Sequence, residues 1–118
     1  MVAQERRSFP RIRDEKVELK LKAGDYDSVT HTMNLSASGA YCKVDKEIAV
    51  MSRVKLAIMF PEDMSPRSIE VEGVVVRAHP VVIDGAIRHY DVAIFFDNLT
   101  EKHRQLILDY ISRRKQVG

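Results

Sequence analysis

The chain has 118 residues, of which 45% are apolar and 31% charged, a composition typical of one soluble globular domain and not of a disordered chain. No apolar run approaches the roughly 20 residues that a membrane-spanning helix needs, so we expect no membrane insertion. The formal net charge is only +2, with basic clusters near both ends and an acidic middle, which argues against a general nucleic-acid-binding surface.

The first thirteen residues are polar, carry four arginines and lack the apolar stretch of a secretory signal. We predict that residues 1–13 form a flexible basic arm and that residues 14–118 form the folded domain. Cys42 is the only cysteine and cannot form a disulfide within the chain, which favours a cytoplasmic location.

Alternation of apolar and polar residues, the pattern of a half-buried strand, recurs along the domain. In the first such run, Val17, Leu19 and Leu21 are separated by charged residues. By this pattern and by β-branched composition, strands are predicted over residues 17–22, 27–33, 40–44, 54–60, 69–78 and 87–96. Asp84-Gly85 predicts a tight hairpin turn between the last two strands.

The C-terminal segment changes to helical periodicity. Thr100 is a suitable N-cap, and apolar residues then recur with the spacing of one helix face. We predict one helix over about residues 100–114, and its apolar face must pack against the strands. Six antiparallel strands close most economically into a barrel, because closure removes exposed sheet edges. The predicted fold is therefore mainly β, a six-stranded antiparallel β-barrel with one C-terminal α-helix.

Signatures of enzymes and of metal sites are missing from the sequence. The glycines are too widely spaced for a phosphate-binding loop, and the histidines lack metal-ligand spacing. Cys42 alternates with apolar residues and is expected to be a buried structural thiol. His79 and His89 are expected at strand ends. We predict no catalytic residue, no metal site and no cofactor.

The first of two notable motifs is an arginine pair, Arg7 and Arg11, preceded by Arg6. Pro10 disfavours a helix here and holds the segment in an extended conformation. Guanidinium groups bind phosphate bidentately and donate two hydrogen bonds to the O6 and N7 edge of guanine. A solvated basic tail is the alternative interpretation of these arginines.

The second motif is Asn34-x-Ser36-x-x-Gly39, which is predicted to lie between two strands. Asn34 can hydrogen-bond to guanine and Ser36 offers a hydroxyl group. Gly39 lacks the Cβ that would keep a flat base away from the backbone. Asparagine, serine and glycine are also ordinary turn formers, so this motif alone leaves simple turn formation as an equal alternative.

The two motifs together, at the start of a small β domain, resemble the PilZ family. The resemblance covers about residues 4–111 and includes the segment 90–96 and the helix entry at Leu99-Thr100. It implies a six-stranded barrel with a C-terminal helix. For many members of the family it also implies binding of cyclic di-GMP, a bacterial second messenger.

The resemblance also implies roles for individual residues in binding cyclic di-GMP. The residues that would hold guanine edges and phosphates are Arg6, Arg7 and Arg11. The residues that would receive a guanine base and its ribose phosphate are Asn34, Ser36 and Gly39. Arg77, on the strand before the last hairpin, is a further candidate contact.

The function implied is a cytoplasmic cyclic di-GMP receptor without catalytic activity. Its arm would change conformation on ligand binding and signal to an unidentified effector protein, with the chain as a monomer or homodimer. One alternative is a PilZ-like barrel that binds no ligand and acts as a protein-interaction adaptor. Another is a barrel that binds single-stranded nucleic acid, which the acidic body of the domain disfavours.

Overall fold

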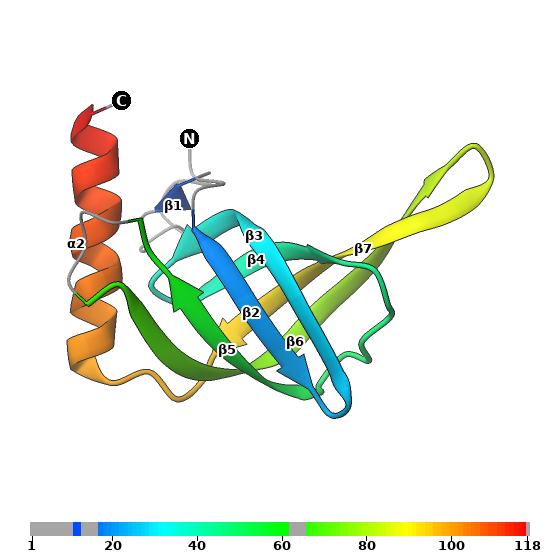
Figure 1. Ribbon diagram of the computed structural model, residues 1–118, viewed down its shortest axis with the longest axis horizontal. Coiled ribbons are helices and arrows are strands. Elements are labelled where there is room, and N and C mark those ends of the chain that lie inside the picture. The colour runs from blue at the N-terminus through cyan, green and yellow to red at the C-terminus, as the bar shows by residue number, and fades with distance from the viewer. Residues whose placement is uncertain (1–10, 13–16, 62–65, 118) are drawn as a thin grey trace, which may run out of the picture.

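The computed structural model describes residues 11–12, 17–61 and 66–117. In chain order the elements are β1 (Arg11–Ile12), β2 (Glu18–Ala23), β3 (Tyr26–Ser36), β4 (Gly39–Val44), β5 (Arg53–Met59), β6 (Ser68–Ile83), β7 (Ala86–Phe96) and α2 (Glu101–Val117). The sheet order is β1-β3-β2-β5-β6-β7-β4, and an additional β3–β4 pairing closes β2 to β7 into an antiparallel barrel (Figure 1). The predicted fold is confirmed, and β1 is a short further strand beside β3.

The barrel interior is filled by the inward-facing residues of the alternating runs. In β2, Leu19 and Leu21 are buried while Lys20 and Lys22 are exposed, as the alternation predicts. Buried side chains from the other barrel strands, such as Ile58 and Val92, complete one continuous core. Burial of this apolar surface is the main favourable contribution to barrel stability.

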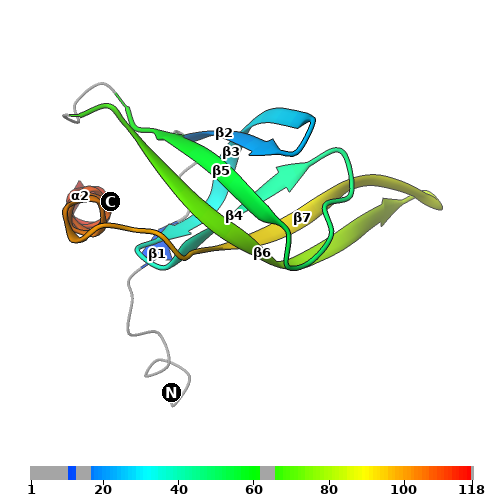
Figure 2. The same cartoon turned by 90° about the horizontal axis from the view of Figure 1, so that it is seen from below.

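Helix α2 covers one end of the barrel (Figures 1 and 2). Its start is capped as predicted, because the Thr100 hydroxyl accepts a hydrogen bond of 3.1 Å from the backbone N–H of His103. The buried face of α2 includes Ile107 and Tyr110, and the Tyr110 ring packs against that of Phe60 with 5.1 Å between centroids. The helix contacts β1 and β3. Within the described part of the chain, no helix combines the length and the apolar character needed to cross a bilayer.

The β6–β7 hairpin extends well beyond the barrel (Figure 1). Its turn at Asp84-Gly85 has positive φ at both residues, 54° and 78°, which confirms the predicted tight turn. The prediction that the strand ends at Ala78 is wrong, because β6 continues through Pro80 to Ile83. Proline is tolerated there because the described part of β5 pairs with β6 only as far as Val74, which leaves one edge open.

The positions expected for two histidines are also corrected. His79 and His89 lie within β6 and β7 and not at strand ends, because the hairpin continues past both. The Nε2 atom of His89 lies 3.2 Å from Oδ1 of Asp91 on the same strand. These histidines therefore belong to the extended hairpin, outside the barrel core.

Candidate functional site

The backbone pairing of β1 with β3 brings the end of the arginine motif to the second motif. Arg11 lies opposite Ser36 and Ile12 opposite Leu35 in an antiparallel register. Arg6 and Arg7 lie outside the described residues, as does most of the predicted 1–13 arm. The two motifs, separated in the sequence by more than twenty residues, thus meet at one edge of the barrel.

A β-bulge in β3 sets the direction of Asn34. Thr32 lies opposite Cys42 and Asn34 lies opposite Tyr41, so one extra residue is accommodated in β3. Thr32 and Leu35 are both fully buried, whereas Asn34 is half-buried. Because the bulge interrupts the strict alternation of inward and outward side chains, the Asn34 side chain can point away from the core. The prediction that Asn34 and Ser36 lie between strands is wrong, because β3 runs through both.

Ser36 has no exposed area, and its hydroxyl group organises the turn that follows. The Ser36 Oγ atom accepts a hydrogen bond of 3.2 Å from the backbone N–H of Ser38 and lies 3.0 Å from the Ser38 hydroxyl. It also donates to the carbonyl oxygen of Gly39 at 3.4 Å. This geometry is that of a serine turn, and it fixes the orientation of Ser38.

The backbone of Gly39 lies close against β7. A Cβ added at this position would lie 2.2 Å from the carbonyl oxygen of Ile94, a distance that real structures essentially never show. The glycine is therefore required for β4 to pair with β7, a reason that is independent of any ligand.

A shallow hollow of ≈ 150 Å³ lies next to this turn, on the surface formed by β4, β6 and β7. Its lining includes Ser38, Gly39, Tyr41, Val76, Ala93 and Phe95. The sequence motifs identify Gly39 but not Ser38, Tyr41 or Phe95. In residues 40–44 the alternation places Tyr41 on the outward face, so the sequence could have identified this residue. It could not identify Phe95, because the contribution of Phe95 depends on the pairing of β4 with β7, which are distant in the sequence.

Arg77 belongs to the same surface. Cross-strand partners form a row from Asn34 through Tyr41 and Ala93 to Arg77. With strands about 4.8 Å apart, the row spans about 14 Å between its first and last Cα atoms. Arg77 is exposed at the end of this row, and a register shift between Val75 and Arg77 precedes it. The row thus carries an amide and a guanidinium group at its two ends, and its two middle members, Tyr41 and Ala93, line the hollow.

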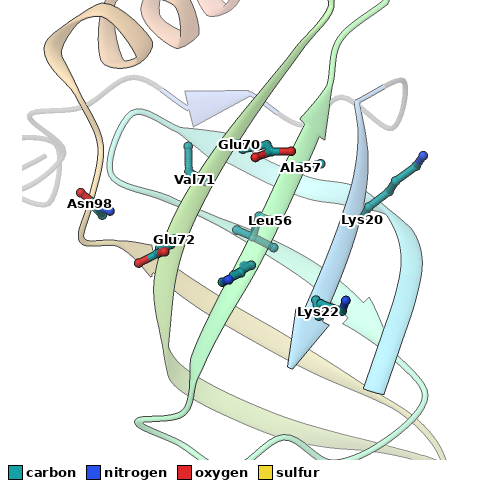
Figure 3. A pocket seen from close by; sticks show the side chains of 9 residues that line it. Lys20, Lys22, Leu56, Ala57, Glu70, Val71, Glu72 and Asn98 are labelled. Atoms are coloured by element: carbon teal, nitrogen blue, oxygen red, sulfur yellow. The ribbon is translucent and has the colours of Figure 1, made fainter. Parts of the chain in front are cut away.

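A larger hollow of ≈ 430 Å³ lies elsewhere, on β2, β5 and β6 (Figure 3). It contains three lysines and two glutamates, Lys20, Lys22, Lys55, Glu70 and Glu72. None of the described residues that line it belongs to either motif. Glu70 is exposed and Glu72 is half-buried.

Two further features bear on chemistry elsewhere in the domain, the Cys42 thiol and the arrangement of side chains that could bind a metal ion. Cys42 is buried, and burial together with the nearby charge of Asp91 raises the pKa of its thiol to about 12, so it is a poor nucleophile. The prediction of a buried structural thiol is confirmed. In the described part of the chain, no group of three or more His, Cys, Asp or Glu side chains is arranged to hold a metal ion.

The sequence matches the model of the PilZ domain over residues 5–113. No curated protein matches it. Among solved structures, the Bacillus subtilis inhibitor of motility MotI/DgrA is similar with a TM-score of 0.80 and 20% identity, over 95% of this chain and 52% of that one. The complex of K. pneumonia MrkH with c-di-GMP has a TM-score of 0.69 and 16% identity, over 95% of this chain and 55% of that one.

The chain therefore spans about half the length of these two proteins. The isolated PilZ domain of Escherichia coli YcgR, solved with c-di-GMP, matches at full domain length, with a TM-score of 0.70, 15% identity and 95% of both chains covered. At sequence identities this low, the similarity to these solved structures shows a shared fold and nothing more. Because the family model spans almost the whole sequence, the chain belongs to the PilZ domain family.

Proposed function

We propose that this protein is a receptor for cyclic di-GMP. The observation that carries the proposal is the pairing of Arg11 with Ser36, which joins the arginine motif to the Asn34–Gly39 motif at one edge of the barrel. Two PilZ-fold structures similar to this chain, MrkH and YcgR, were solved with this ligand, which supports the same ligand class here.

The residue roles follow from side-chain chemistry. The guanidinium groups that bind the phosphates and guanine edges are those of Arg6, Arg7 and Arg11. Asn34 hydrogen-bonds one guanine, and Arg77 contacts the ligand from the far end of the same cross-strand row. Ser36 acts through the turn, since its buried hydroxyl positions Ser38, and Gly39 keeps β4 close to β7.

The signal arises from the arm that precedes the barrel. A ligand with two phosphates neutralises the arginines and holds the part of the arm before β1 against the barrel, at an entropic cost of about 1–2 kcal/mol for each backbone residue ordered. Several charge-assisted hydrogen bonds offset this cost. The changed surface is then read by an effector protein in the cytoplasm, with no catalytic step on this chain.

Isothermal titration calorimetry tests the proposal. We expect saturable binding of cyclic di-GMP and none of GTP or cyclic di-AMP at the same concentrations. Arg11→Ala is expected to abolish measurable binding with little change in melting temperature. Arg88→Ala removes an exposed arginine from the distant hairpin and serves as the matched control, with binding unchanged. Equal affinity of the Arg11→Ala variant and the natural protein would refute the assigned role of the arginine motif.

A second candidate function is that of an adaptor that binds a protein but no nucleotide. The observation in its favour is the extended β6–β7 hairpin, on which Val82, Ile83 and Ile87 are 58%, 47% and 54% exposed. Exposed apolar side chains gathered at one site are typical of protein contacts. Absence of any heat of binding with cyclic di-GMP would favour this function over the receptor.

A further inference from the structure

The side chain of Phe95 is unusually exposed for an aromatic residue in a strand that is paired on both sides. It lies on β7, between β4 and β6, and yet its side chain is 49% exposed. Its direct cross-strand partner on β4 is Gly39, and its partner on β6 is Val74. Neighbouring side chains normally cover one another across a sheet, but a glycine has none to offer. The ring of Phe95 is therefore left uncovered on the side toward β4.

The surroundings of this ring combine an apolar wall with polar groups. Phe95 lines the ≈ 150 Å³ hollow together with Val76, which is 51% exposed, and with the half-buried Tyr41. Ser38, held by its hydrogen bonds to Ser36, lines the same hollow. An exposed flat ring beside hydrogen-bonding groups suits a heteroaromatic base, whose face stacks on the ring while its edge is bound by polar atoms.

We propose that Phe95 is the stacking platform for one purine base of the ligand. This inference rests on the proposed function, and it assigns a binding residue that lies outside both sequence motifs. Stacking on Phe95 supplies affinity for the base face, and Asn34, at the end of the neighbouring cross-strand row, supplies recognition of the base edge. Because every base has a π-face, Phe95 contributes affinity for any purine, and the polar groups select guanine.

A merely structural role for Phe95 makes a different prediction. In that role the ring would cover the backbone at Gly39, and its loss would lower stability without affecting ligand binding. Phe95→Leu separates the two roles, because leucine keeps an apolar side chain of similar reach but has no flat π-face. For stacking, we expect cyclic di-GMP to bind this variant about 10-fold to 100-fold more weakly, as for the loss of one base–aromatic stack.

The absence of tryptophan from the sequence offers a direct spectroscopic test. Phe95→Trp introduces a single indole at the proposed platform. Ile87→Trp introduces one on the same strand at a similarly exposed position, 54% against 49%. The two positions are eight residues apart, about 27 Å along an extended strand. We expect cyclic di-GMP to quench the emission of Phe95→Trp over the concentration range in which calorimetry detects binding, and to leave that of Ile87→Trp unchanged.

The outcomes separate this inference from the proposed function. If the natural protein binds cyclic di-GMP in calorimetry but Phe95→Leu binds equally well, Phe95 is not a stacking platform and the receptor function stands. Binding by Phe95→Trp without any change in its emission overturns the inference in the same way. If the natural protein gives no heat of binding, the receptor function fails and the stacking role fails with it.

Discussion

Gly39 lies so close to the carbonyl oxygen of Ile94 that a Cβ at this position would be only 2.2 Å from it. The close approach joins the end of the Asn34–Gly39 motif to β7, the strand that also carries Phe95. The same glycine thus permits the pairing of β4 with β7 in the barrel and leaves Phe95 uncovered at the proposed ligand site.

Gly39→Ala is expected to destabilise the fold by about 1–3 kcal/mol, the usual cost of forcing extra volume into a packed site. Gly73→Ala is the matched comparison. Its Cβ would lie 2.7 Å from a side-chain carbon of Ile94 and from the carbonyl oxygen of Phe95, so we expect a smaller loss. Urea unfolding measures both free energies. Stability of Gly39→Ala equal to that of the natural protein would contradict the close packing of β4 against β7.

Ser36→Ala is expected to lower the free energy of unfolding by about 1 kcal/mol and to weaken cyclic di-GMP binding. The reason is loss of the 3.2 Å hydrogen bond from the Ser38 amide, which fixes the turn beside the hollow. Ser68→Ala, at an exposed position on β6, is the control for removal of a serine hydroxyl. Unchanged unfolding and unchanged binding in Ser36→Ala would show that the buried hydroxyl does not organise this turn.

The ion pair of Arg53 with Asp97 predicts a pH dependence of stability. Two hydrogen bonds of 2.7 and 3.1 Å from the Arg53 guanidinium, opposed only in part by desolvation, lower the pKa of Asp97. A lowered carboxyl pKa stabilises the fold at pH values above the unfolded pKa of about 3.9, and this contribution is lost as the pH falls through the folded value.

Asp97→Asn should therefore melt at a lower temperature than the natural protein at pH 7, and the difference should shrink below about pH 4. Thermal melts across this pH range measure the effect. High salt should also reduce the difference, because the pair is exposed. A difference in melting temperature that stays constant down to pH 2 would mean that the Asp97 charge does not contribute.

The thiol of Cys42 is expected to be inert in the folded protein. Its pKa of about 12, raised by burial and by Asp91, leaves very little thiolate at pH 8, and the side chain has no exposed area. Ellman's reagent should react with it only as fast as the protein unfolds, and immediately in denaturant. Rapid reaction of the folded protein would contradict the burial of this residue.

Local patterns were sufficient to predict the barrel. Alternation at Leu19 and Leu21, the Asp84-Gly85 turn and the Thr100 cap each depend on neighbouring residues, and the structure confirms all three. The extension of β6 through Pro80 could not be predicted in this way, because proline is tolerated there through the open side of β6, which the described part of β5 pairs with only as far as Val74.

The site was less predictable than the fold because its features depend on contacts between distant segments. The outward position of Asn34 follows from a β-bulge in β3, and the need for glycine at position 39 follows from Ile94, 55 residues later in the chain. The exposure of Phe95 follows in turn from that same pairing. The motif residues identify the edge of the barrel where the ligand is proposed to bind, but not all the residues around it.

Mapping of backbone amide chemical shifts during titration with cyclic di-GMP tests the location of the site most directly. We expect the largest shifts over residues 34–41, at Arg77 and around Phe95, with the amides of Arg11 and Ile12 also shifted. The lysine-lined hollow on β2 and β5 serves as the internal comparison and should not respond. Shifts confined to Lys20, Lys22 and Lys55, or none at saturating ligand, would contradict a cyclic di-GMP site where β1 meets the Asn34–Gly39 motif.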